Sequence, residues 1–393
     1  MKKIISVLMA AVLVFGMSVS AFAFDVKEPL KFGEDGKFSI MHVTDTHLES
    51  DNVDDSVWLI GQACDKENPD LVVITGDNVY NDDDAEITKG YITKLMNTFE
   101  ERNIPVAVTF GNHDSERGAM SREELMAFYN TFSCSVSVDD GILLSGCGTY
   151  NLPVMSSDGT KIKFNVWVFD SHDYDEEGEY GWVKKDQVEW YKATSDALRL
   201  LNGGEKVYSL AFQHIIVPEV YDALKKADGK PLFSFEHIFN KGDYYMFDPE
   251  NVNYGTLNET PCSGKQNDGQ FDAMVEKGDV LAIFTGHDHT NAFGVRHKNI
   301  DIMNSLSTRY NGDAFSTQYG YRMLVIDEND TSTYETKVVH WYDMITFENM
   351  AEFGTNKTAF SVAFTGMFQK FFQNLWREMV AMFTGRTISY PDK

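Results

Sequence analysis

Histidine and acidic side chains recur directly after short apolar runs of this sequence. Asp45 and His47 follow the run Phe38–Val43, and Asp77 follows the run Leu71–Ile74. The same pattern continues along the chain with Asn112, His113, Asp114, His214, His287 and His289. Neutral imidazoles and carboxylates together are typical ligands of Zn, Mn or Fe. The pattern therefore predicts a metal centre at the ends of several strands.

The number of candidate ligands favours two metal ions over one. A single ion with an open coordination position needs only about three protein ligands. Seven candidates are present: Asp45, His47, Asp77, Asn112, His214, His287 and His289. Seven ligands suit two ions that share one bridging carboxylate, and such a pair can clamp an in-line displacement at phosphorus. We therefore expect a dinuclear site that holds Fe, Mn or Zn.

The elements that must position these residues alternate between strands and helices. Short runs rich in Val, Ile and Phe are typical of buried strands. Six such runs are Phe38–Val43, Leu71–Ile74, Val106–Phe110, Phe164–Phe169, Val207–Phe212 and Val280–Phe284. Apolar residues at three- and four-residue spacing predict helices at Val53–Cys64, Ala85–Phe99, Arg122–Tyr129 and Lys184–Leu198. This alternation predicts an α/β (α+β layered) fold, in which ligands bind outside the carboxyl ends of the strands.

The later part of the chain contains strands with few helices between them. These are Ala292–Val295, Ile300–Met303, Tyr321–Ile326 and Thr333–Trp341. They predict a second, more antiparallel sheet packed against the first. Residues 225–270 are rich in Gly and Asp and only weakly periodic, which favours a long loop insertion that shapes a substrate pocket.

The two ends of the chain differ from the predicted domain, residues 24–345. Residues 1–23 combine Lys2 and Lys3, an apolar run and Ala21-Phe22-Ala23, a pattern typical of a signal peptide cleaved after Ala23. The protein is therefore expected to be exported, either secreted or periplasmic. In that oxidising setting, Cys134 and Cys147 form either a hairpin disulfide or two buried thiols.

The C-terminal extension, residues 346–393, has an amphipathic helical pattern. One helical face carries Phe360, Phe364, Met367, Phe371, Leu375 and Met379. We favour a helix docked on the domain, with membrane association of residues 360–383 as the alternative.

The chain has 34 Lys and Arg against 60 Asp and Glu, a net charge of −26. So acidic a surface repels polyanions, so we expect no nucleic-acid partner. The oligomeric state stays open.

The ordered set of motifs resembles the calcineurin-like metallophosphoesterase superfamily. Its five blocks are Asp45-x-His47, Gly76-Asp77, Gly111-Asn112-His113-Asp114, His214 and Gly286-His287-x-His289. The residues in and around the last two blocks resemble those of the single-domain branch labelled purple-acid-phosphatase-like. The resemblance implies a β-sandwich of two mixed sheets flanked by helices, with the metals at the sheet edges.

The resemblance also implies roles for the individual residues. The first metal would be held by Asp45, His47 and His289. The second would be held by Asn112, His214 and His287, and Asp77 would bridge the two. His113 would protonate the leaving alkoxide, and Asp114 would orient its imidazole. In purple acid phosphatases a tyrosine at the position of Tyr80 binds iron, but this chain also has His47, which we favour as the ligand.

These roles predict an exported hydrolase of small phosphoesters. A metal-bridging hydroxide would attack a phosphate monoester while His113 acts as general acid. The first alternative is a phosphodiesterase acting on nucleotides, cyclic nucleotides or phospholipid head groups, because both reactions use the same residues. The second alternative is a non-catalytic metal-binding protein on the same scaffold.

Overall fold

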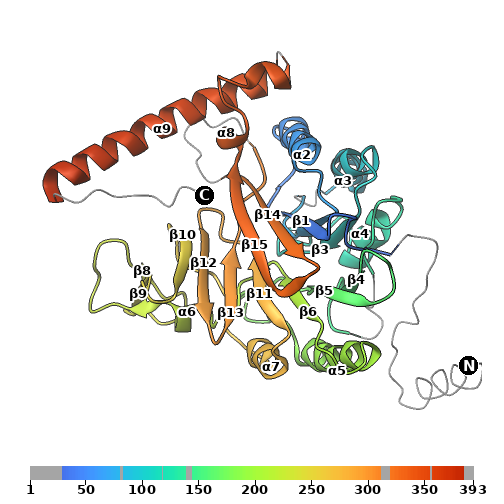
Figure 1. Ribbon diagram of the computed structural model, residues 1–393. Coiled ribbons are helices and arrows are strands. Elements are labelled where there is room, and N and C mark those ends of the chain that lie inside the picture. The colour runs from blue at the N-terminus through green and yellow to red at the C-terminus, as the bar shows by residue number, and fades with distance from the viewer. Residues whose placement is uncertain are drawn as a thin grey trace, which may run out of the picture.

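Two large β-sheets form the body of the protein (Figure 1). The computed structural model describes residues 29–79, 83–116, 118–138, 144–310, 319–354 and 356–384. The predicted signal peptide therefore lies outside the described residues. The first sheet has the order β15 (Asp330–His340), β14 (Gly320–Asp327), β1 (Lys37–Val43), β2 (Leu71–Thr75) and β3 (Val106–Thr109). Its last three strands run parallel, while β14 pairs antiparallel with β1.

The second sheet has seven strands and is also mixed. Its order is β10 (Val252–Thr256), β12 (Ala292–His297), β13 (Ile300–Asn304), β11 (Val280–Thr285), β6 (Tyr208–Phe212), β5 (Ile162–Val168) and β4 (Tyr150–Met155). The central strands β13, β11, β6 and β5 are parallel, and β12 and β4 pair antiparallel with their neighbours. The predicted sandwich of two mixed sheets is confirmed.

Three apolar layers hold the sandwich together. Phe38 and Val73 of the first sheet meet Val166 and Phe212 of the second in the layer between the sheets. The outer face of the first sheet packs against α2 (Val53–Glu67), α3 (Ala85–Glu100) and α4 (Arg122–Tyr129). The outer face of the second packs against α5 (Lys185–Leu201), α6 (Val220–Ala223) and α7 (Gln270–Lys277). The strands of both sheets are thus buried on two faces, which is why they read as continuous apolar runs.

Local signals set the helix boundaries. The α4 helix starts at a capping box, in which Ser121 accepts from the Glu124 N–H and the Glu124 side chain accepts from the Ser121 N–H. Asp84 caps α3 by accepting from the Glu86 N–H. The predicted helices are confirmed within a few residues at each end.

The late strands do not form a sheet of their own, and that expectation is corrected. The strands β14 and β15 complete the first sheet beside β1, whereas β12 and β13 complete the second beside β11. The segment 225–270 is not wholly loop. It contains a small sheet of β7 (Lys225–Lys226), β9 (Tyr244–Met246) and β8 (Phe235–Glu236), and it also supplies β10.

The chain ends in α8 (Trp341–Met344), the 3₁₀ turn η1 (Met350–Phe353) and the long helix α9 (Lys357–Thr384). Within the described ranges, no helix combines the length and hydropathy of a transmembrane span. None of the four cysteines, all of which lie within the described residues, forms a disulfide, so Cys134 and Cys147 follow the buried-thiol alternative.

Candidate metal centre

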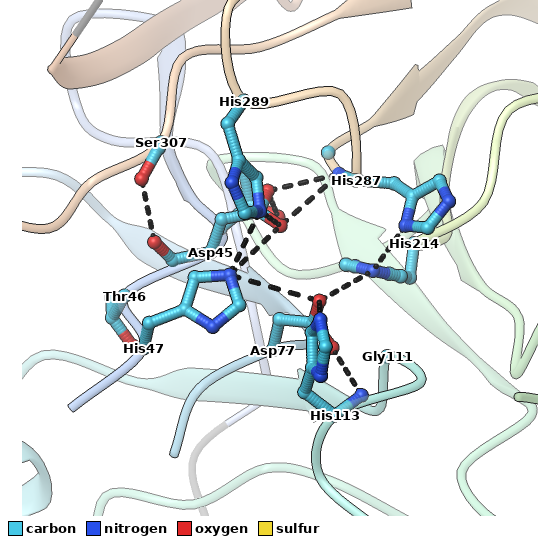
Figure 2. Close-up of polar contacts among 12 residues, drawn as sticks. Asp45, Thr46, His47, Asp77, Gly111, His113, His214, His287, His289 and Ser307 are labelled. Carbon is cyan, nitrogen blue, oxygen red and sulfur yellow. Dashed lines mark hydrogen bonds and ion pairs between the residues drawn. The ribbon is translucent and has the colours of Figure 1, made fainter. Parts of the chain in front are cut away.

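The loops at the carboxyl ends of β1, β2, β3, β6 and β11 bring the candidate ligands together (Figure 2). Four of these residues have left-handed backbone conformations, with φ of 52° at Asp45, 40° at His47, 50° at Asp77 and 73° at His287. Non-glycine residues rarely adopt this region, and such strain is concentrated at functional sites. The strained turns point side chains from separate strands at one place.

Two glycines allow this close approach. A Cβ atom at Gly111 would lie 2.7 Å from both the backbone nitrogen of Asp77 and Nε2 of His214. A Cβ atom at Gly286 would collide with the side chains of Thr44 and Asp45. Any larger residue would therefore push the ligand loops apart.

The first group of ligand atoms comprises Asp45, His47, Asp77 and His289, whose atoms all lie within 4.8 Å of one another. His47 Nε2 is 3.8 Å from both Asp45 Oδ1 and Asp77 Oδ2. The Nε2 atoms of His47 and His289 face each other at 2.8 Å. Two imidazole nitrogens and two carboxylates aimed at one point form a donor set that suits a transition metal.

The second group comprises Asp77, His214 and His287, again within 4.8 Å. His214 Nε2 lies 3.1 Å from Asp77 Oδ2 and 3.2 Å from His287 Nδ1. The buried Oδ1 of Asn112 makes no hydrogen bond among the described residues, while its Nδ2 donates to the Tyr174 hydroxyl at 2.9 Å. The amide oxygen of Asn112 is thus available to a metal ion.

Asp77 belongs to both groups, as expected of a bridging carboxylate. The residues therefore fit two adjacent metal ions. His289 is 38% exposed and His113 is 28% exposed, whereas Asp45 and Asp77 are fully buried, so the site opens to solvent on one side. Tyr80 lies outside the described residues, and its role stays a prediction.

The electrostatics favour the metal-binding protonation states at four of the candidate ligands. Burial lowers the pKa of His47 and of His287 to about 3, which keeps both imidazoles neutral. Burial alone would raise the pKa of Asp45, but the hydrogen bond to His289 and the charge of His214 hold it below its usual range. Burial would also raise the pKa of Asp77, but the nearby His214 lowers it. Both carboxylates are therefore ionised, as ligands must be. Burial would lower the pKa of His214, but the charge of Asp77 raises it to about 9, so metal binding must displace a proton there.

The imidazole of His113 is held by a residue that the sequence reasoning missed. His113 Nδ1 lies 2.6 Å from Glu116 Oε2, and the Tyr174 hydroxyl donates to the other oxygen of Glu116. His113 Nε2 lies 4.0 Å from Asp77 Oδ2, on the side of the metal ligands. The only sequence signal for Glu116 is its position three residues after His113 in the same loop.

The expectation that Asp114 orients His113 is corrected. Asp114 Oδ2 accepts from the backbone N–H of Asp77 and of Gly111, both at 2.8 Å. Its Oδ1 accepts from the backbone N–H of Asn78 at 3.0 Å and of Val79 at 3.3 Å. Asp114 therefore ties the loop after β2 to the loop after β3, and Glu116 takes the role expected of it beside the imidazole.

The segment 225–270 reaches the site through its last residues. Glu259 Oε1 accepts from the backbone N–H of Thr290 at 2.5 Å. The Cys262 N–H donates to Asp288 at 3.1 Å. Since Asp288 lies between two candidate ligands, this segment supports the loop that carries them.

The sheet order, the shared carboxylate and the histidine clusters define a dinuclear metallohydrolase type of site. The sequence pattern of the Calcineurin-like phosphoesterase family matches residues 38–291. The chain belongs to this family, which confirms the resemblance noted from the motifs.

The chain is also similar to individual proteins. The chain is 28% identical over 331 residues to "Probable inactive purple acid phosphatase 14" of Arabidopsis thaliana, covering 75% of this chain and 76% of the plant protein. It is 26% identical over 288 residues to "Phosphatase DCR2" of Saccharomyces cerevisiae, covering 67% of this chain and 46% of the yeast protein. A solved dimetal phosphatase from Danio rerio aligns with 77% of this chain and 98% of its own, with 13% identity and a TM-score of 0.46.

Proposed function

We propose that this protein hydrolyses phosphate monoesters with two bound metal ions. The observation that carries the proposal is that Asp77 is shared by two groups of ligand atoms, with His113 beside it. When bound, two metal ions supply Lewis-acid charge and an acidified water at such a site. The name of the yeast relative, "Phosphatase DCR2", supports a monoester substrate.

The residues of the chain supply the remaining chemistry. Glu116 hydrogen-bonds Nδ1 of His113 and so fixes the ring with Nε2 on the side of Asp77. A proton on Nε2 can then pass to the leaving oxygen of the substrate. Asn112 and His113 are adjacent, so one loop carries both a candidate metal ligand and the proton donor.

The test is a comparison of substrates and metals. Protein treated with a chelator is assayed with nitrophenyl phosphate and with bis(nitrophenyl) phosphate, while Zn, Mn and Fe are added back separately. We expect turnover to require added metal and to favour the monoester. A preference for the diester would assign the phosphodiesterase alternative, since the same residues serve both reactions.

The non-catalytic alternative also has a specific observation, because relatives are named as probable inactive phosphatases. Against it, all seven expected ligand residues and His113 are present here. If the metal-loaded protein were no faster than its Asp77→Asn variant on either substrate, the protein would be a metal binder without this activity.

We also propose that the protein is exported and that the chain is cleaved after Ala23. The support is the basic, apolar and small-residue order of the first 23 residues. N-terminal sequencing of protein recovered outside the cytoplasm should begin at Phe24. A chain that still began at Met1 would contradict the proposal.

A further inference from the structure

The helix α9 exposes a continuous aromatic face. The exposed large apolar residues at its start are Phe360, Phe364, Met367, Phe368, Phe371 and Phe372. Their rings contact one another in series, as in the pairs Phe360–Phe364 and Phe364–Phe368, at 6.1 Å and 4.8 Å between centroids. Soluble proteins rarely leave so many adjacent apolar side chains in water, which marks an interaction surface.

The opposite face of α9 attaches the helix to the domain. Ala359, Val362 and Ala363 are buried, and Ala359 and Val362 join the core beneath α2 and α3. A Cβ atom at Gly366 would lie 2.8 Å from Cβ of Tyr342 in α8, so the two helices are in close contact. The start of α9 therefore packs on the domain through its small residues, whereas the phenylalanine face that was expected to dock is exposed. Figure 1 shows α9 projecting from the α8 end of the protein.

The charge of this segment differs from that of the rest of the chain. Residues 357–372, the part of α9 whose side chains the structure describes, contain two Lys and no Asp or Glu, whereas the whole chain has a net charge of −26. Both Lys357 and Lys370 are exposed on α9. Charges of the acidic body farther away than a Debye length, about 8 Å at physiological salt, are largely screened. The described part of α9 thus carries only positive charge, which suits the phosphates of lipid headgroups, and Lys370 also lies close enough to Asp343 of α8 to interact with its charge.

Hydrogen bonds at both ends of the first turn of α2 connect the first turn of α9 to the loop that carries His47. The Thr358 hydroxyl donates to Asp55 in the first turn of α2. That turn adjoins Asn52, whose Nδ2 donates to the backbone oxygen of His47 at 2.9 Å. A surface bound by α9 would therefore lie at the same end of the protein as the first ligand loop.

We propose that the aromatic face of α9 binds the surface of a phospholipid bilayer. Phenylalanine side chains would enter the boundary between headgroups and acyl chains, and the helix would lie in the plane of the interface. Lys357 and Lys370 would add attraction to anionic headgroups. This proposal does not depend on catalysis, because it concerns a surface outside the metal centre.

The test measures sedimentation of the full chain with vesicles. One set of vesicles is phosphatidylcholine, and the other is phosphatidylcholine with an equal amount of phosphatidylglycerol. We expect wild type to bind the mixed vesicles. The double variant Phe364→Ser/Phe371→Ser should bind them ~100-fold more weakly, because each substitution removes one aromatic ring that would be buried in the interface. The matched control, Leu200→Ser/Phe233→Ser, removes two exposed apolar side chains elsewhere and should bind like wild type.

Further measurements make the outcome decisive. Lys357→Glu/Lys370→Glu should bind the mixed vesicles more weakly than wild type, and added salt should reduce the difference. Equal thermal unfolding of all variants would show that the fold is intact. Wild type that stays in solution, or aromatic variants that sediment like wild type, would overturn the proposal. A dimer in sedimentation velocity that the aromatic variants lose would also overturn it, because a second copy would then cover this face.

Discussion

The acidic residues Asp77 and Glu116 have different roles in the site, and the groups around each carboxylate determine its role. Asp77 is buried between His47 and His214, so its charge serves two ligand groups at once. Glu116 is partly exposed and lies at the edge of the site, where it hydrogen-bonds His113 and Tyr174. Residue type alone cannot separate these roles, but the partner atoms can. Each role predicts a different variant phenotype.

Substituting His113 should slow turnover without releasing metal. We expect His113→Ala to lose about 10²–10⁴-fold in kcat on alkyl phosphates, because it removes the proton donor. The loss should be smaller on nitrophenyl phosphate, whose leaving group needs no proton. Metal analysis should still find two ions per chain. Equal losses on both substrates would contradict the role of general acid.

Glu116→Gln should weaken the same step more mildly. A partly exposed charged hydrogen bond contributes about 1 kcal/mol, so we expect kcat on alkyl phosphates to fall about fivefold with KM unchanged. The exposed Glu123→Gln in α4 is the matched control and should behave like wild type. If Glu116→Gln raised KM and left kcat intact, Glu116 would bind substrate instead of positioning His113.

Asp77→Asn should lose more metal than any other single ligand substitution. The amide removes the negative charge that both ligand groups share, so the affinity for both ions should fall. The control is Asp70→Asn, because the Asp70 carboxylate lies away from the site and accepts a hydrogen bond from the Ser39 N–H. Two ions per chain in Asp77→Asn would remove Asp77 from the bridging position.

At the scale of elements, Asp114 joins the loops that follow β2 and β3. Asp114→Ala would leave four backbone N–H groups without their acceptor, and each such loss costs about 1–3 kcal/mol when water cannot replace it. We expect a loss of at least about 3 kcal/mol in the free energy of unfolding by urea. Asp114→Asn should lose less, because its amide oxygen can still accept. A variant with wild-type stability would show that these loops hold together without the clamp.

The strands that carry ligands could be predicted because their burial is local in sequence. Runs such as Leu71–Thr75 are buried throughout, and the candidate ligand Asp77 follows two residues after the strand ends. The strand β4 was missed because Tyr150–Met155 alternates between buried and half-buried residues and contains Pro153, as befits an edge strand. The division of β12–β15 between two sheets was also missed, because β14 pairs with β1 from the far end of the chain and no local pattern encodes that pairing.

The residues of the site also divide into those that a local motif predicts and those that depend on contacts between distant segments. The ligands were predictable because each lies in a short motif next to its strand. The hydrogen bond between Tyr174 and Glu116 joins two loops 58 residues apart, so neither loop alone indicates it. The exposed face of α9 was assigned to docking for a similar reason. Periodicity identifies an apolar face but not its partner.

At the scale of the whole molecule, bound metal ions would add to the stability of this acidic protein. Asp45 and Asp77 are buried together in a protein whose net charge is −26, and bound cations offset that charge locally. Ligands that bind only the folded state stabilise it, by roughly 4 kcal/mol for each ion present at a thousand times its Kd. Removing both ions with a chelator should therefore lower the Tm by on the order of 10 °C in calorimetry. Adding back the cognate metal should restore the Tm, whereas Asp77→Asn should respond much less to the chelator. A Tm that did not change on chelation of the wild type would show that the buried carboxylates are balanced by the histidines alone.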